Sequence, residues 1–154
     1  MNWYLKVLKK YAVFHGRARR KEYWYFILFS TLIYFAFALI DVVAGFSDEI
    51  TDGGPLSTLY YLAVILPEIA VAARRLHDTS HSGWWQLMAF PILAVPWLTN
   101  HHQEFWSLLV VVITLPGLMV LLLWQVRDSD PGENRWGPNP KKGLVAAEVP
   151  SDTA

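Results

Sequence analysis

The stretch ARRLHDTSHSGWW, from Ala73 to Trp85, places two arginines, two histidines and an aspartate between two long apolar runs. Charged side chains are costly inside hydrocarbon, so a charged stretch in this position marks a place where the chain leaves a membrane and turns back. TSHSG is a turn-forming sequence, and Gly83 gives the backbone freedom before the aromatic pair Trp84 and Trp85. We interpret the stretch as a hinge between two membrane crossings, and as a candidate binding surface.

The composition of the 154-residue chain points to a membrane protein. It is 54% hydrophobic and 17% charged, unlike an ordinary soluble domain. Eight Trp, seven Tyr and eight Phe fit this class, because rings with a polar edge collect where hydrocarbon meets lipid headgroups. There is no cysteine, which excludes disulfides, thiolate catalysis and cysteine-ligated metal sites.

Four apolar runs predict membrane-spanning helices at about residues 24–46, 55–73, 84–99 and 105–126. About 20 residues of helix cross a hydrocarbon layer of about 30 Å. The run 84–99 is short and contains Pro91 and Pro96, so it is the run most expected to be kinked or irregular. The predicted fold is an all-α integral membrane bundle of four transmembrane helices.

The basic residues are segregated along the chain. All thirteen precede the first run, follow the second or follow the fourth: Lys6, Lys9, Lys10, Arg17, Arg19, Arg20 and Lys21; Arg74 and Arg75; Arg127, Arg135, Lys141 and Lys142. The loops 47–54 and 100–104 carry acidic residues and no basic ones. Under the positive-inside rule this pattern predicts four crossings with both termini in the cytoplasm. Three crossings would place Arg127 and all that follows outside, so the pattern favours a crossing by 84–99.

The two ends of the chain are expected to differ. Residues 1–14, MNWYLKVLKKYAVF, predict a short amphipathic helix in the membrane interface, with Tyr4 and Leu8 on one flank and lysines on the other. Residues 143–154 show no periodicity and predict a disordered cytoplasmic tail. Residues 1–142 are thus expected to form a single membrane domain.

Glu68 interrupts the second apolar run. It precedes Arg74 by six positions, which places it about 9 Å deeper along a helix axis. An ionised side chain at a bilayer centre costs about 2.5–3.5 kcal/mol, so Glu68 is expected to be protonated, paired or facing a wet cavity. Arg75 and Arg20 are its candidate partners. Two interpretations remain open: a proton or cation relay, and a buried ion pair that fixes helix register.

The arginines of the opening stretch suggest an anion site. Arg74 and Asp78 have the i,i+4 spacing of a helical pair, so RRLHD is expected to continue the second helix out of the membrane. Arg74 and Arg75 would lie at headgroup depth near the basic residues before the first span, where they could hold a phosphate. The alternative is that they only set topology. Residues 127–141 are rich in turn formers and predict a loop folding under the bundle.

Other chemistries receive little support. His77 and His81 have the i,i+4 spacing of a metal pair beside Asp78, but no third ligand is evident. Ser80 could be assembled with His77 and Asp78 into a triad only on paper, because triads are defined by geometry. The acidic residues within 127–141 do not match the calcium loop of an EF-hand. No phosphate-binding glycine loop is present, and lipid is a nearer anion than nucleic acid.

Three stretches together resemble a known family. FHGRARRKEYWYF (14–26), PEIAVAARRLHDTSHSGWW (67–85) and GENRWGPNP (132–140) resemble the bacterial inner-membrane family called domain of unknown function 805, over about residues 3–142. The resemblance implies a small multi-spanning membrane protein and no established activity. It singles out Gly16, Arg17, Arg20, Tyr23, Trp24, Arg74, Arg75, His77, Asp78, Gly83, Trp84, Trp85, Gly132, Asn134, Gly137 and Pro140.

The sequence leads to two functional hypotheses and disfavours a third, a lipid-modifying enzyme at the rim, because no convincing nucleophile–base pair is present. The first is a non-enzymatic membrane protein that binds anionic lipid headgroups or a protein partner through a cytoplasmic rim of Arg17, Arg20, Arg74, Arg75, His77, Asp78 and Asn134. Interfacial anchoring is assigned to Tyr23, Trp24, Trp84 and Trp85. The second is a small transporter or channel subunit that titrates Glu68 and works as an oligomer, because four helices enclose little space. No catalytic residue, metal or cofactor is expected under either.

Overall fold

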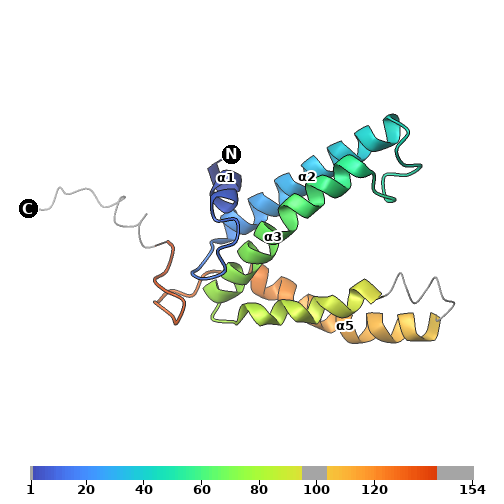
Figure 1. Cartoon of the computed structure of the whole chain (residues 1–154). Coiled ribbons are helices and arrows are strands. Elements are labelled where there is room, and N and C mark those ends of the chain that lie inside the picture. Colours follow the sequence, from blue (N-terminus) through green and yellow to red (C-terminus); the bar gives the residue numbers. More distant parts are fainter. Residues whose placement is uncertain (1, 95–103, 142–154) are drawn as a thin grey trace, which may run out of the picture.

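The computed structural model describes residues 2–94 and 104–141, and these residues are helical with connecting turns (Figure 1). The described part holds no β-strand and one isolated bridge, between Asn134 and Gly137. The elements are α1 (Asn2–Lys9), α2 (Arg20–Val43), α3 (Pro55–Asp78), the 3₁₀ helix η1 (Gly83–Ala94) and α5 (Glu104–Val126).

Within the described residues, three helices are long and apolar enough to cross a membrane: α2, α3 and residues Phe105–Val126 of α5. They correspond to the first, second and fourth predicted spans. The first span begins four residues earlier than predicted, and α3 continues through RRLHD to Asp78 as expected. Thr79–Ser82 then turn the chain, and Ser80 adopts a positive φ of 63°.

The third predicted span lies only partly within the described residues. Its described part is η1, whose 3₁₀ geometry and internal Pro91 agree with the irregularity expected there, because proline removes a backbone donor. Residues 95–99, the loop 100–103 and the tail 143–154 lie outside the described residues.

A buried carboxylate closes the α2–α3 hairpin. Asp41, near the end of α2, accepts hydrogen bonds from the backbone N–H groups of Leu56 and Ser57 (3.1 and 2.9 Å) and from the Ser57 hydroxyl (2.8 Å). These contacts satisfy donors that the first turn of α3 leaves free. A Cβ added to Gly54 would lie 2.3 Å from the Asp41 carboxyl carbon, so only glycine fits beside this cap.

Helix α1 packs against the other end of the hairpin. The Tyr4 ring stacks on Phe26 at 5.2 Å, and its hydroxyl lies 3.2 Å from that of Tyr60. Val7 is fully buried in the same apolar cluster, with Tyr4 and Leu8 packed around it. The flank of the segment predicted to be apolar therefore faces α2 and α3.

The α2–α3 hairpin is the first of two antiparallel arms. Helices η1 and α5 form the second. Trp85 at the start of η1 contacts Trp124 near the end of α5, with ring centroids 5.4 Å apart. Further along, Gly117 lies so close to Met88 that an added Cβ would be 3.2 Å from the Met88 side chain. Figure 1 shows the two arms meeting near the C-terminal end of α3 and diverging from there.

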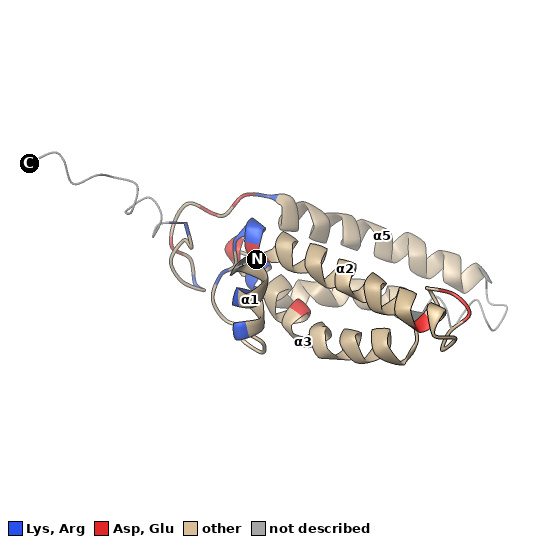
Figure 2. Cartoon of the chain, turned by 90° about the horizontal axis from the view of Figure 1, so that it is seen from above, with Lys and Arg blue, Asp and Glu red and all other residues tan. Residues whose placement is uncertain are grey.

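The charged side chains are segregated in space. Figure 2 shows Lys and Arg at the end where α1 and residues 127–141 lie, and Asp and Glu without them at the opposite end of the α2–α3 hairpin. We call the first of these the charged end. Between the ends, the helices expose large apolar side chains such as Leu32, Leu62 and Leu108. Extensive exposed apolar surface is typical of contact with lipid.

Candidate functional site

Asp78, the last residue of α3, is shared by two arginines. Its carboxylate accepts hydrogen bonds from Arg17 Nε (2.9 Å), Arg75 Nη1 (2.6 Å) and the Ser129 hydroxyl (2.5 Å). The Asp78 side chain is 0% exposed, and neither arginine side chain exceeds 1%. We call these four residues the arginine network. A carboxylate between two guanidinium groups is an arrangement that compensates charges removed from water.

Arg17 also reaches the C-terminal loop, residues 127–141. Its Nη1 donates to the Gly132 carbonyl and its Nη2 to the Asp130 carbonyl, both at 2.7 Å. The Asp130 N–H donates in turn to the Asp78 carbonyl at 3.1 Å. One side chain from the segment before α2 thus ties the end of α3 to a loop more than one hundred residues away.

Arg75 caps the end of α5. Its Nε donates to the Gln125 carbonyl at 3.1 Å, and its Nη2 donates to the carbonyls of Trp124 and Arg127. The last carbonyls of a helix have no intrahelical donor and carry partial negative charge. These carbonyls therefore offset the positive charge that remains when two arginines share one carboxylate.

A second buried pair joins α3 to α2. Arg74 Nη1 donates to Glu22 Oε1 at 3.2 Å, and Lys6 lies 2.7 Å from Glu22 Oε2. The predicted i,i+4 pair of Arg74 with Asp78 is therefore wrong. Consecutive helical residues point about 100° apart, so Arg74 is directed at α2 while Arg75 is directed at α5.

The C-terminal loop folds against the end of α3. Asn134 Nδ2 donates to the His77 carbonyl at 2.8 Å, and the His77 ring stacks on Trp136 at 4.5 Å. His77 Nδ1 also lies 3.2 Å from the Gly16 carbonyl. His81 stacks instead on Trp124. The two histidines spaced like a metal pair therefore lie against different indoles.

The outer edge of the charged end is more open. Asp128 is exposed and lies 3.4 Å from Arg20 Nη2. The Lys141 ammonium donates to Asp128, and this hydrogen bond holds the pKa of the carboxyl below its usual range. Exposed pairs of this kind contribute little to stability.

The residues expected to form the cytoplasmic rim lie together at the charged end: Arg17, Arg20, Arg74, Arg75, His77, Asp78 and Asn134. Three of the four arginines and the aspartate are buried, and their partners are each other, the Glu22 carboxylate and backbone carbonyls, whereas Arg20 is exposed. Of the predicted interfacial anchors, Trp24, Trp84 and Trp85 are exposed, and Tyr23 is half-buried.

Sequence reasoning missed several partners. Glu22 is the only acidic residue in the basic stretch that precedes the first span, and this isolation is a signal that could have identified it. Asp41 likewise stands alone at the end of an apolar run. Ser129 and the carbonyl of Asp130 carry no comparable signal, because turn-rich loops offer many polar groups at similar spacing.

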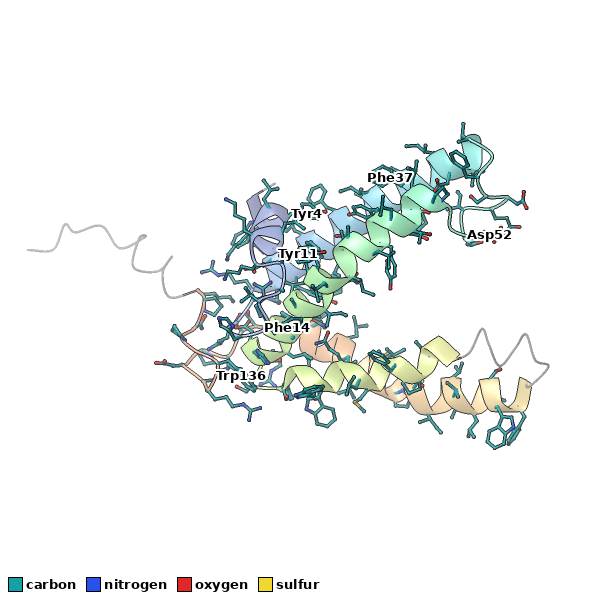
Figure 3. The ribbon with its side chains drawn as sticks, in the orientation of Figure 1. Tyr4, Tyr11, Phe14, Phe37, Asp52 and Trp136 are labelled. Atoms are coloured by element: carbon teal, nitrogen blue, oxygen red, sulfur yellow. The ribbon has the colours of Figure 1, made fainter. Side chains whose placement is uncertain are left out.

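A groove of about 1020 Å³ lies between the two arms, lined by α3, η1, α5 and residues next to them. Phe14 and Trp136 line it at the end where the arms meet (Figure 3). Glu68 lines its α3 wall. The predicted partners of Glu68 are engaged elsewhere, Arg75 with Asp78 and Arg20 with Asp128, and no ion pair reaches Glu68 within residues 2–94 and 104–141.

Asp78→Asn tests the arginine network. The change leaves two buried guanidinium groups without a carboxylate, and breaking a buried pair in this way costs about 3–5 kcal/mol. We expect a lower midpoint of thermal unfolding and faster tryptic cleavage at Arg127 and Arg135 in purified protein. Glu133→Gln, an exposed change in the same loop, should alter neither measurement. Wild-type stability and protease resistance in Asp78→Asn would show that the network does not hold the loop.

Comparison with known proteins agrees with this architecture. The model of the family described as "Protein of unknown function (DUF805)" matches residues 11–138. Inner membrane protein YhaH of Escherichia coli (strain K12) is 41% identical over 141 residues, covering 92% of this chain and 98% of the relative. Inner membrane protein YhaI of the same strain is 39% identical over 143 residues, covering 93% and 98%. No solved structure matches the chain. The chain therefore belongs to the DUF805 family, whose relatives named here are inner membrane proteins.

Proposed function

We propose that this chain is a non-enzymatic inner-membrane protein whose charged end lies at the cytoplasmic surface and binds anionic lipid headgroups. The observation that carries the proposal is the division of the basic residues into two sets. Arg17, Arg74 and Arg75 are buried and paired. Four basic residues around them are exposed: Lys9, Arg20, Lys21 and Arg127. The buried set fixes the shape of the rim, and the exposed set contacts phosphate.

The proposed topology has four crossings, both termini in the cytoplasm and α1 in the membrane interface. It is supported by the clustering of helix ends: the start of α2, the end of α3, the start of η1 and the end of α5 all lie at the charged end. The twelve residues of η1 extend about 24 Å at the 3₁₀ rise of about 2 Å per residue. This length covers most of a hydrocarbon layer of about 30 Å, which is compatible with a third crossing by this segment.

A reporter fused after Ala154 tests this topology. We expect green fluorescence from a fluorescent-protein fusion and no activity from an alkaline phosphatase fusion, because the positive-inside rule keeps the final basic segment in the cytoplasm. A phosphatase fused after Asp52, in the opposite loop, is the matched control and should be active. An active C-terminal phosphatase would divide the charged end between two compartments and refute the topology.

Charge neutralisation tests the headgroup contact. Lys9→Gln, Arg20→Gln and Lys21→Gln combined should lower the enrichment of phosphatidylglycerol around the protein, since each basic side chain near an anionic surface contributes about 1 kcal/mol. The measurement is the lipid composition retained by protein extracted from vesicles of phosphatidylglycerol and phosphatidylcholine, determined by native mass spectrometry. The wild-type enrichment should fall as salt is raised before extraction.

The matched control removes three exposed charges from the opposite end, as Asp48→Asn, Glu49→Gln and Asp52→Asn. It should retain the wild-type lipid composition. Equal phosphatidylglycerol enrichment in the basic triple variant and the wild type would contradict the proposal.

A second candidate function is favoured by Glu68. The carboxylate lines the groove and has no ion-pair partner among the described residues, whereas Arg74 and Arg75, almost two turns further along α3, are engaged. An acid in this position is suited to a small transporter or channel subunit that titrates Glu68. Such a subunit would work as an oligomer, because few helices enclose little space.

Glu68→Gln tests this second candidate. The amide of glutamine does not bind and release a proton as a carboxyl group does. Voltage-driven proton uptake into proteoliposomes should therefore fall to the level of empty vesicles. An enclosed pH-sensitive dye reports the uptake, and Glu133→Gln serves as the control that retains it. Equal uptake by Glu68→Gln and wild type would exclude Glu68 as the titrating group.

A further inference from the structure

Among the residues that the structure describes, Glu68 has no cationic partner. Arg74 pairs with Glu22, and Arg75 pairs with Asp78. The sequence holds no Lys or Arg between Lys21 and Arg74 or between Arg75 and Arg127. The described Lys and Arg side chains thus belong to segments at the charged end, and Glu68 lies about 9 Å below Arg74 along α3.

The groove beside Glu68 has the dimensions and walls of a ligand site. Its volume of about 1020 Å³ lies at the upper end of the range of about 300–1,000 Å³ for small-molecule pockets. Apolar and aromatic side chains dominate the lining, among them Tyr23, Tyr61 and Phe90. Aromatic faces attract cations, and apolar walls select a hydrophobic body.

A second group in the groove also lacks a donor. Gln125 lines the groove from α5, is 8% exposed, and has a buried side-chain oxygen without a hydrogen-bond partner. Leaving a buried acceptor unsatisfied costs about 1–3 kcal/mol. Gln125 Oε1 is enclosed, whereas Glu68 is partly exposed and lines the groove, so an occupant that carries N–H donors would pair with Glu68.

We propose that the groove binds a lipophilic ammonium ion, with its apolar body between the two arms and its N–H groups donating to Glu68. The inference rests on the second candidate function and names the class of its ligand. An anionic lipid without a cationic group would be repelled by the carboxylate, and an uncharged lipid such as a diacylglycerol would leave the charge unpaired. A second copy of the chain would present spanning helices that contain no Lys or Arg at the depth of Glu68.

The test measures binding of 1-naphthylmethylamine, which is protonated at neutral pH, to the full chain in phosphatidylcholine nanodiscs. Equilibrium dialysis gives the bound fraction, and empty nanodiscs correct for partition into lipid. The neutral analogue 1-naphthalenemethanol is measured in parallel. We expect saturable amine binding that Glu68→Gln weakens about tenfold or more, the loss of one charge-assisted contact. The alcohol should bind more weakly and respond little to the substitution.

Further variants separate charge from packing. Glu68→Asp keeps the carboxylate and should retain most of the amine binding, while Glu133→Gln should leave it unchanged. Ile69→Trp fills the groove while Glu68 keeps its charge, and it should block binding of both probes. Leu59→Trp, an exposed position of α3 away from the groove, is its matched control. Thermal unfolding in the nanodisc verifies that each variant is folded.

Three results would overturn the inference: no saturable amine binding, equal binding to wild type and Glu68→Gln, or equal affinity for amine and alcohol. Absence of binding together with two chains per nanodisc would assign the groove to a second copy. Proton uptake distinguishes this inference from the function on which it rests. Uptake without amine binding refutes only the ligand class, and amine binding without uptake supports the site and refutes transport.

Discussion

The structure depends on one shared carboxylate. Asp78 lies between Arg17 and Arg75, and both arginines are buried. Their charges are tolerated because each guanidinium nitrogen donates to an oxygen atom. Those oxygens come from α3, from the end of α5 and from the C-terminal loop. Since a buried guanidinium must keep its partners, the positions of these segments are coupled. The charged end is thereby built as a unit, although its parts are distant in sequence.

Pairing in the network and isolation of Glu68 have the same cause. Arg75 could have turned back toward Glu68, but Asp78 three residues on and the free carbonyls of α5 provide more oxygen partners. Arg75 is thus fully occupied at the C-terminal end of α3 and does not pair with Glu68. The same pairing limits contact with headgroups, because a guanidinium enclosed by carbonyls has no N–H donor left for a lipid phosphate. The proposed contact with headgroups is therefore assigned to exposed side chains such as Arg20.

The sequence predicted what local physics determines. Apolar length set the spans that became α2, α3 and the described residues of α5, and RRLHD was correctly assigned to the last turn of α3. Partner choice could not be read in the same way. Arg74 was paired with Asp78 on spacing alone, but helix rotation sends it to Glu22 on a neighbouring helix, and such a contact exists only after packing. Asp41 was passed over for the same reason, since the donors it caps lie on α3.

The arrangement of the arms has a mechanical consequence. Asp41 fastens α2 to α3 at the far end of their hairpin, whereas the η1–α5 arm meets that hairpin near the end of α3. The two arms therefore join at the charged end, which is the pivot about which one arm would rotate relative to the other. The 23 residues of α5 extend about 34 Å, so a pivot rotation of about 10° displaces the tip by about 6 Å. In this geometry, a small rotation at the charged end would correspond to a much larger separation of the helix tips.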